Sequence, residues 1–343
     1  MQHRFFIAPM SLMGAGCLKQ AGKEIKKLNL KKAIVVTCKS ILESEIITQL
    51  KDMLDENKID YVIYDKTKAR PDMSDIITGV DMLKKENCDF IISFGGNSTR
   101  NCAKGMSLMI RCKDGVCKSD ESLPLVAINV TSFMTGEVPI FTQKNKGGDE
   151  KILIDRSTTP IITVTDSDLL KGISNKIMGA IGIDALRHAV EAYLSDAATP
   201  MTDACAFQAI KILSSNLENI IDKDSIDDDV REQITYGNYM AGISYNNTVL
   251  GHIYSMEEKN YHEENIQQEK DRVFISESQG FSSDKIFKKM MEVSFAMGND
   301  IKDIDEDTAM AFVMDEIKRL SDKVGIPCGM SKDERVIFGK GRL

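Results

Sequence analysis

Short β-branched runs alternate with amphipathic segments through the first half of the chain, and this alternation restricts the fold more than any other feature of the sequence. Two segments in which apolar residues have helical spacing, 43–58 and 75–87, separate the first three runs. The strand-like runs are KAIVVT (32–37), DYVIYD (60–65), DFIISF (89–94), PLVAIN (124–129), ILID (152–155) and IITVT (161–165). Such alternation favours βαβ units and a parallel sheet that helices cover on both faces.

The second half of the sequence has a different periodicity. Beyond about residue 170 long helical patterns take over, and five of the seven prolines lie before this point. The helical segments are 174–194, 200–221, 228–258, 282–298 and 306–324. We therefore predict an α/β domain over residues 1–170 and an all-helical domain over residues 171–343.

Composition and charge exclude several classes of protein. The 343 residues carry a net charge of -8, and no apolar run reaches the length that spans a membrane. The start, MQHRFFIAPM, lacks the pattern of a secretory signal, and the eight cysteines include no C-x-x-C pair. We expect a cytoplasmic protein with reduced thiols that binds neither nucleic acid nor a membrane.

A glycine turn follows the third strand-like run, in the segment DFIISFGGNSTRNCAKG (89–105). Gly95 and Gly96 allow the backbone to approach a ligand closely, and Asn97 and Ser98 would open the next helix. The free N–H groups and the dipole of that helix favour an anion such as pyrophosphate. A purely structural Gly-Gly turn explains the same pattern, and on the pattern alone both interpretations stay open.

An acid and an imidazole occupy one face of the first long helical segment. Asp184 and His188 are four residues apart, so their side chains lie one above the other on a helix. A carboxylate and an imidazole make half of a ligand set for Fe²⁺ or Zn²⁺.

Further motifs follow in order along the chain. They are VTSFMTGE (130–137), GIDALRHAVEAY (182–193), ATPMTDA (198–204), NNTVLG (246–251) and GIP (325–327). Together with GGNSTRNCAKG (95–105), they resemble the iron-containing (group III) alcohol dehydrogenases, especially the branch of propanediol, lactaldehyde and methanol dehydrogenases. The chain ends at Leu343, sooner after the last motif than the family pattern does.

The resemblance implies a fold and an activity. The expected fold is a Rossmann-like nucleotide-binding domain followed by an all-helical domain, the architecture of the dehydroquinate-synthase-like and iron alcohol dehydrogenase proteins. The expected activity is that of an alcohol dehydrogenase or aldehyde reductase acting on small primary alcohols. NAD or NADP would supply the hydride chemistry, Fe²⁺ or Zn²⁺ would polarise the substrate oxygen, and the protein would be a homodimer.

The metal site implied by the resemblance differs from the family pattern. The family uses one aspartate and three histidines, of which Asp184 and His188 match the first two. Tyr254 stands where the third ligand belongs, and Gln268 or its neighbour Gln267 aligns with the fourth. We expect Asp184, His188, Tyr254 and Gln268 at the metal.

The charged segment beyond Tyr254 has two interpretations. Tyr254, Glu258 and His262 are spaced at i, i+4 and i+8, which would rebuild a ligand face on a continued helix. Alternatively, 257–271 is a solvated segment with no metal role. In that case the chain would be a catalytically impaired nucleotide-binding homologue that has lost the metal site. A metal-free reductase is a third alternative.

Nine residues match the cofactor positions of the family. They are Gly95, Gly96, Asn97, Ser98, Asn101, Thr131, Thr135, Lys151 and Cys38. Asn97 replaces the third glycine of the family turn, and Asn101 replaces an aspartate. Phe133 stands where the family has a glycine, close to the expected nicotinamide end. Cys38 replaces the acid that meets the adenosine ribose, which leaves NADP open beside NAD.

Overall fold

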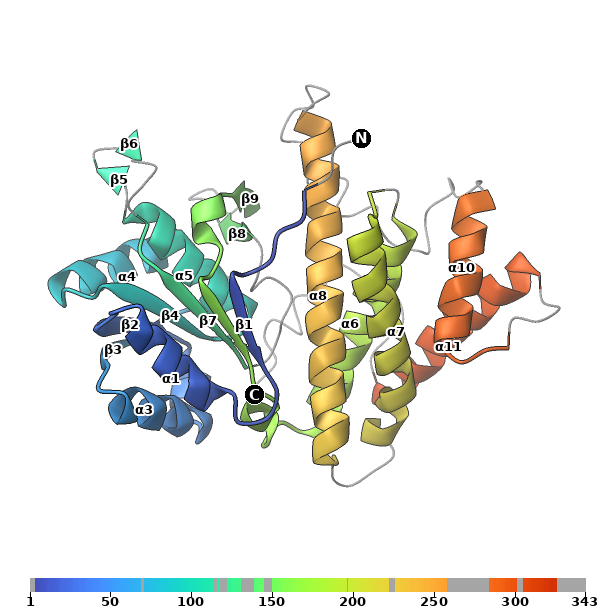
Figure 1. Ribbon diagram of the computed structural model, residues 1–343, viewed down its shortest axis with the longest axis horizontal. Helices are drawn as coiled ribbons and strands as arrows, with labels where there is room; N and C mark the ends of the chain where they lie inside the picture. Colours follow the sequence, from blue (N-terminus) through green and yellow to red (C-terminus); the bar gives the residue numbers. More distant parts are fainter. Residues whose placement is uncertain are drawn as a thin grey trace. The chain divides into compact units, whose positions relative to one another are not determined.

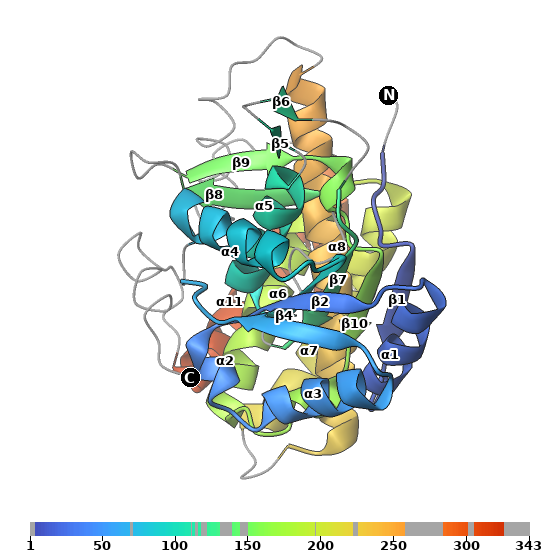
Figure 2. The same cartoon turned by 90° about the vertical axis from the view of Figure 1, so that its left-hand side faces the viewer.

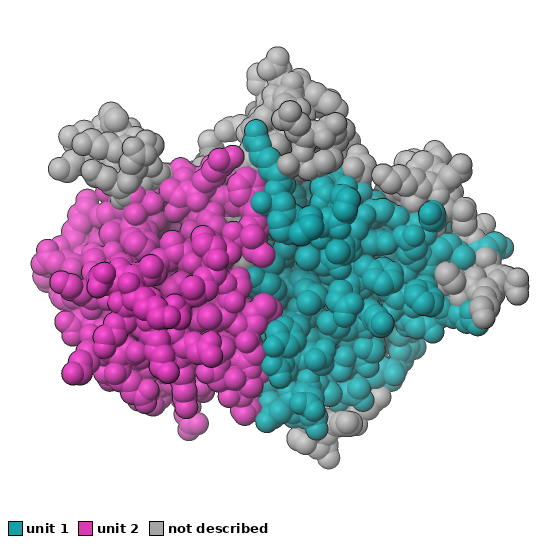
Figure 3. Space-filling view, viewed as in Figure 1, with its two compact units in different colours: residues 1–5, 173–329 teal, residues 6–172, 330–343 magenta. Residues whose placement is uncertain are grey.

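The chain divides into two compact units (Figure 3). The described part of one unit is built from residues 6–172 and is called the sheet unit below. The described part of the other lies within residues 4–5 and 173–329 and is called the helical unit. The computed structural model describes residues 4–68, 71–110, 112–113, 116–117, 122–130, 139–144, 150–195, 197–221, 226–257, 284–300 and 305–325.

A six-stranded sheet forms the centre of the sheet unit, and every neighbouring pair of its strands is parallel (Figures 1 and 2). The strands are β1 (Met10–Met13), β2 (Lys32–Val36), β3 (Asp60–Tyr64), β4 (Phe90–Gly95), β7 (Leu125–Asn129) and β10 (Ile162–Thr165). Their order is β1-β10-β7-β4-β2-β3. This confirms the parallel sheet that the sequence predicts.

The strand order contains a topological switch point. From β2 the chain moves outward to β3, then crosses back to β4 on the other side of β2 and continues to β7 and β10. In open sheets of this type, ligands bind in the crevice at the carboxyl ends of the strands where the direction of winding reverses. The switch point lies between β2 and β4.

Helices cover both faces of the sheet, as expected. Successive side chains of β2 point to opposite faces of the sheet and pack into two apolar cores. Ala33 and Val35 belong to one core, and Ile34 and Val36 belong to the other. The first core contains residues of α1 and α3, and the second contains residues of α4 and α5. The helices are α1 (Leu18–Lys27), α2 (Lys39–Leu42), α3 (Ile46–Glu56), α4 (Met73–Lys85) and α5 (Asn97–Met109), with short 3₁₀ turns η1 (Arg156–Thr158) and η2 (Ser167–Leu170).

Among the described residues, two antiparallel pairs of strands lie outside the parallel sheet. The strands are β5 (Cys112–Lys113) with β6 (Val116–Cys117), and β8 (Ile140–Lys144) with β9 (Glu150–Ile154). The predicted strand 152–155 therefore belongs to a hairpin. Five residues separate β8 from β9, whereas a parallel crossover needs a dozen or more.

Five helices make up the described part of the helical unit, at the positions that the periodicity predicts. They are α6 (Asn175–Leu194), α7 (Pro200–Ile221), α8 (Asp228–Glu257), α10 (Asp284–Ala296) and α11 (Glu306–Val324). Gly182 of α6 lets α7 approach, because a Cβ at this position would stand 2.6 Å from the Leu217 side chain. Among the helices described, none is long and apolar enough to span a bilayer.

Candidate functional site

The glycine turn lies at the carboxyl end of β4, beside the switch point of the sheet. Gly95 has φ +151°, a conformation that favours glycine, and a Cβ there would stand 2.7 Å from Thr99 Oγ1 and 3.0 Å from Ile41 Cδ1. Gly96 is extended and serves as the N-cap of α5. Gly96 has no side chain with which to cap this helix, and the amino end of α5, the positive end of its dipole, lies at the carboxyl end of β4.

The carboxyl end of β2 forms the other side of the switch point. Thr37 Oγ1 donates to the Phe94 carbonyl over 2.9 Å and ties the ends of β2 and β4 together. Cys38 follows directly, with its Sγ 3.2 Å from Ser40 Oγ, and its backbone bridges to Lys66. Lys66 is exposed, so a cation lies on the segment paired with Cys38.

A buried arginine, which is not among the residues that match the cofactor positions of the family, underlies the glycine turn. Arg100 is fully buried, and its Nη2 donates to Asn97 Oδ1 over 2.5 Å. Its Nη1 donates to Asn129 Oδ1 at the end of β7 over 2.7 Å. Asn97 and Arg100 are three residues apart on a helix, and this spacing alone predicts that their side chains can meet. The contact with Asn129 had no local signal.

The structure describes only some of the remaining cofactor candidates. Asn101 lies in α5 and is half-buried. Thr131 and Thr135 lie outside the described residues. Lys151 lies in β9, where it pairs with Gln143 of β8, and its side chain is not described. The structure thus brings together the turn residues and places Cys38 at the same switch point.

In the helical unit, Asp184 and His188 lie on successive turns of α6. His188 Nδ1 is 2.6 Å from the Asp184 carbonyl and 3.7 Å from its Oδ2. With a proton on Nδ1, the ring donates to that carbonyl and keeps Nε2 as an acceptor, which is the usual arrangement of a metal-binding histidine. Tyr245 of α8 contacts the ring edge to face, with centroids 4.4 Å apart.

The other two metal positions lie outside what the structure describes. Tyr254 falls in the last turn of α8, but its side chain is not described, and Gln268, Glu258 and His262 lie in the undescribed range 258–283. Within the described ranges, no three His, Cys, Asp or Glu side chains gather closely enough to hold a metal. Asp184 and His188 are the two candidate donors whose side chains the structure describes, and both are of a type that Fe²⁺ and Zn²⁺ accept.

Glu191 follows His188 by one turn on α6. Burial raises the pKa of its carboxyl from 4.5 to about 7, and the nearby His188 and Arg187 only partly oppose this rise. A carboxyl that titrates near neutrality beside a candidate metal pair is able to exchange a proton at working pH.

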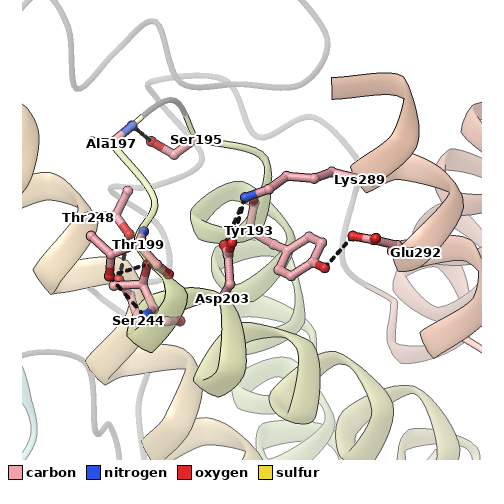
Figure 4. Close-up of polar contacts among 10 residues, drawn as sticks. Tyr193, Ser195, Ala197, Thr199, Asp203, Ser244, Thr248, Lys289 and Glu292 are labelled. Carbon is pink, nitrogen blue, oxygen red and sulfur yellow. Dashed lines mark hydrogen bonds and ion pairs between the residues drawn. The ribbon is translucent and has the colours of Figure 1, made fainter. Parts of the chain in front are cut away.

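A polar cluster joins three helices of the same unit (Figure 4). Lys289 Nζ of α10 donates to the Tyr193 carbonyl over 2.6 Å and to the two Asp203 carboxylate oxygens over 2.8 and 3.0 Å. The Tyr193 hydroxyl donates to Glu292 Oε2 over 2.6 Å. Nearby, Thr199 N donates to Thr202 Oγ1 at the start of α7 over 2.7 Å. Tyr193 and Asp203 belong to two sequence motifs, and here they have a structural role.

Two family models match the chain over both halves. The model described as iron-containing alcohol dehydrogenase matches residues 8–167, and the model of the C-terminal part of the Fe-containing alcohol dehydrogenase family matches residues 178–334. The chain belongs to the iron-containing alcohol dehydrogenase family. Membership confirms the resemblance drawn from the motifs.

Similar proteins of this family include two curated enzymes and a solved structure. Alcohol dehydrogenase 4 of Schizosaccharomyces pombe is 36% identical over 74% of this chain and 62% of its own length. The NAD-dependent methanol dehydrogenase of Bacillus methanolicus is 32% identical over 74% of this chain and 68% of its own. The crystal structure of a 1,3-propanediol oxidoreductase has a TM-score of 0.81 at 24% identity and covers 95% of this chain and 88% of its own. The match to the S. pombe enzyme thus leaves more than a third of that relative uncovered.

Proposed function

We propose that the chain is a metal- and NAD(P)-dependent alcohol dehydrogenase or aldehyde reductase that acts on small primary alcohols. The observation that carries this proposal is the glycine turn, which lies at the switch point of the sheet in a member of this family. The similar methanol dehydrogenase, which is named as NAD-dependent, supports both the cofactor class and the size of the substrate.

The turn residues fit a dinucleotide. Gly95 and Gly96 leave no side chain between the end of β4 and the first turn of α5, and the backbone N–H groups of Asn97 and Ser98 suit a pyrophosphate. Asn101, Thr131, Thr135 and Lys151 complete the proposed set, as the family pattern implies.

The adenosine end of the proposed site favours NADP over NAD. Cys38 carries no carboxylate to receive a ribose 2′-hydroxyl, and Lys39 is exposed next to it. Lys66 lies on the segment paired with Cys38 and is also exposed. Lys39 Nζ also lies 3.6 Å from Glu43 Oε1 in an exposed pair. The missing carboxylate at residue 38, together with the two lysines, suits a 2′-phosphate.

The metal proposal begins with Asp184 and His188, and Tyr254 and Gln268 complete the proposed set. When bound, Fe²⁺ or Zn²⁺ supplies Lewis-acid polarisation of the substrate oxygen, and the nicotinamide supplies the hydride chemistry. The chain's own part is to orient the donors: with a proton on Nδ1, His188 donates to the Asp184 carbonyl, and Tyr245 packs edge to face against the imidazole ring.

We further propose a cytoplasmic homodimer. Five cysteines whose side chains the structure describes are free thiols, which suits a reducing compartment: Cys17, Cys38, Cys88, Cys102 and Cys205. The strand β1 lies at an edge of the sheet, and Ile7 and Met10 in and before it are exposed, which supports an apolar contact with a second copy at this edge.

Metal content tests the proposal first. The full chain is loaded anaerobically with Fe²⁺ or Zn²⁺, desalted and assayed by elemental analysis, and then tested for aldehyde-dependent NADPH and NADH oxidation with acetaldehyde. We expect stoichiometric metal and turnover in the wild type and loss of both in His188→Ala. Lys176→Ala, an exposed position on the same helix, is the control.

Three outcomes would contradict the proposal. Metal retention unchanged in His188→Ala would place the metal elsewhere. Nucleotide binding without metal retention or turnover in the wild type would favour the impaired homologue, and turnover that persists in strong chelator would favour a metal-free reductase.

A further inference from the structure

We propose that Arg100 is a positioning residue of the cofactor turn, and that it acts by holding the Asn97 side chain away from the space that a pyrophosphate occupies. The inference rests on the proposed function, because the pyrophosphate belongs to the NAD(P) proposed above. It concerns a residue that the motif comparison did not single out.

The Arg100 guanidinium binds residues on both sides of the turn. Asn97 is the first residue of α5, and Arg100 Nη2 donates to its Oδ1 over 2.5 Å. Nη1 donates to Asn129 Oδ1 over 2.7 Å and lies 3.5 Å from the Gly95 carbonyl. The Arg100 side chain is fully buried, so its guanidinium is held in one orientation beneath the turn.

Asn129 connects the Arg100 guanidinium to the rest of the sheet. It is aligned with Gly95 of β4 on one side and with Thr165 of β10 on the other. Its Nδ2 donates to Thr165 Oγ1 over 3.2 Å, and both side chains are fully buried. A continuous polar row thus runs from Asn97 across the carboxyl ends of β4, β7 and β10. The row is built into the sheet, so the position of the guanidinium does not depend on a loop.

The need for such a support follows from Asn97 itself. The family turn has a glycine at this position, and an asparagine adds an amide side chain in the first turn of the helix. Unheld, this amide samples several rotamers, some of which occupy the region where the N–H groups of α5 meet an anion. The bond from Arg100 selects one rotamer. The guanidinium also adds a positive charge beneath the helix N-terminus, which favours a bound phosphate.

Direct titration of the full chain with NADPH and NADH tests the inference without reference to turnover. The sequence contains no tryptophan, so nucleotide fluorescence reports binding without indole background. We expect Arg100→Met to weaken dinucleotide binding by about tenfold, because the Asn97 side chain is no longer held and the positive charge beneath the helix N-terminus is lost. Arg100→Lys should recover part of the loss. Lys27→Met removes an exposed charge of the same unit and should leave binding unchanged.

A second background separates positioning from general structural support. In Asn97→Gly there is no side chain to hold, so Arg100→Met should weaken binding clearly less than it does beside Asn97. A merely structural arginine predicts the same loss in both backgrounds, and that result, or no loss at all, would overturn the inference. If Arg100→Met does not fold, Asn97→Leu provides the test: it leaves an unheld side chain of similar shape and should weaken binding more than Asn97→Gly does, and equal binding by these two variants would overturn the inference.

The outcomes also distinguish the two proposals. Wild-type protein that binds neither dinucleotide would overturn the proposed function and, with it, the role of Arg100. Wild-type protein that binds a dinucleotide, with equal affinity in the Arg100 variants, would overturn the positioning role alone.

Discussion

Cys38 is the single residue on which the cofactor preference of the proposed site depends. It follows β2 at the switch point, and the exposed Lys39 and Lys66 flank it in the sequence and in the backbone pairing. Replacing Cys38 with Asp introduces an acceptor for a ribose 2′-hydroxyl and repels a 2′-phosphate. We expect the ratio of kcat/KM for NADPH over NADH to fall by about tenfold or more, measured by steady-state kinetics on the metal-loaded protein.

The matched control for this substitution is Cys38→Ser, which has a similar size and no charge. It should keep the wild-type preference, because the repulsion comes from the carboxylate and not from the loss of sulfur. An unchanged preference in Cys38→Asp would mean that residue 38 does not face the ribose.

Glu191 makes stability depend on pH. Its pKa in the folded protein is about 7, against 4.5 as its ordinary value, because burial disfavours the charged form. The folded state therefore binds this proton more tightly than the unfolded state. The resulting stabilisation is complete below about pH 4.5 and is lost as the pH rises to about 7, with a total of about 3 kcal/mol.

Urea unfolding of metal-free protein between pH 4.5 and 7.5 measures this contribution. The glutamine in Glu191→Gln does not titrate, so this variant should not lose the stability that the wild type loses as the pH rises. The difference in free energy of unfolding, variant minus wild type, should therefore increase with pH. Glu45→Gln, at an exposed position, is the control for the loss of one carboxylate. Wild-type and Glu191→Gln curves that run parallel across this range would show that Glu191 is not the titrating group.

The sequence predicts residue pairs of short spacing better than pairs that join distant segments. Asp184 and His188 were identified because helical periodicity alone places them on one face. Arg100 and Lys289 were not, since their partners Asn129 and Asp203 lie 29 and 86 residues away. Such contacts depend on strand order and helix packing, which no local pattern encodes.

Among the elements, α10 is attached to its neighbours by a polar contact as well as by apolar packing. The Lys289 side chain is 12% exposed and the Asp203 side chain 29% exposed, so their ion pair is largely desolvated. The ammonium also lies 4.7 Å from the Tyr193 ring centroid. Removing the cation leaves a half-buried carboxylate without this partner, which is costly.

Lys289→Met keeps the aliphatic stem and removes the charge. We expect a loss of about 2 kcal/mol in the free energy of unfolding, below the range for fully buried pairs because Asp203 is partly solvated. Amide hydrogen exchange should become faster in α10 (Asp284–Ala296) first.

The exposed pair Lys318–Asp322 on α11 provides the comparison for this effect. Its side chains are 62% and 54% exposed, so Lys318→Met should cost no more than about 0.5 kcal/mol. Equal effects of the two substitutions would mean that burial does not strengthen the Lys289 contact.

Element positions were the most predictable part of the fold. The helical segment 306–324 was predicted with the bounds that α11 has, and 200–221 with those of α7. The pairing of β9 was not predictable from its own apolar run, because a short run looks the same in a parallel sheet and in a hairpin. Only the short connection between β8 and β9 separates the two possibilities.

At the scale of the whole molecule, the two candidate sites belong to different compact units. The glycine turn lies within residues 6–172, and the Asp184–His188 pair lies within residues 173–329. Each proposed ligand should therefore stabilise the unit that holds its contacts, because binding to the native state alone lowers the population of locally opened forms. At a free concentration one hundred times its Kd, a ligand adds about 2.7 kcal/mol.

Hydrogen exchange measured by mass spectrometry distinguishes the two effects in one protein. NADPH alone should slow exchange in α5 and at the ends of β2 and β4, while Fe²⁺ or Zn²⁺ alone should slow exchange in α6 and α8. The metal effect should vanish in His188→Ala, and the nucleotide effect should remain. Protection by NADPH confined to the helical unit would contradict the assignment of the turn, and protection by metal confined to the sheet unit would contradict the assignment of the pair. Because each ligand is added separately, neither result depends on turnover, so the two sites are tested independently of each other.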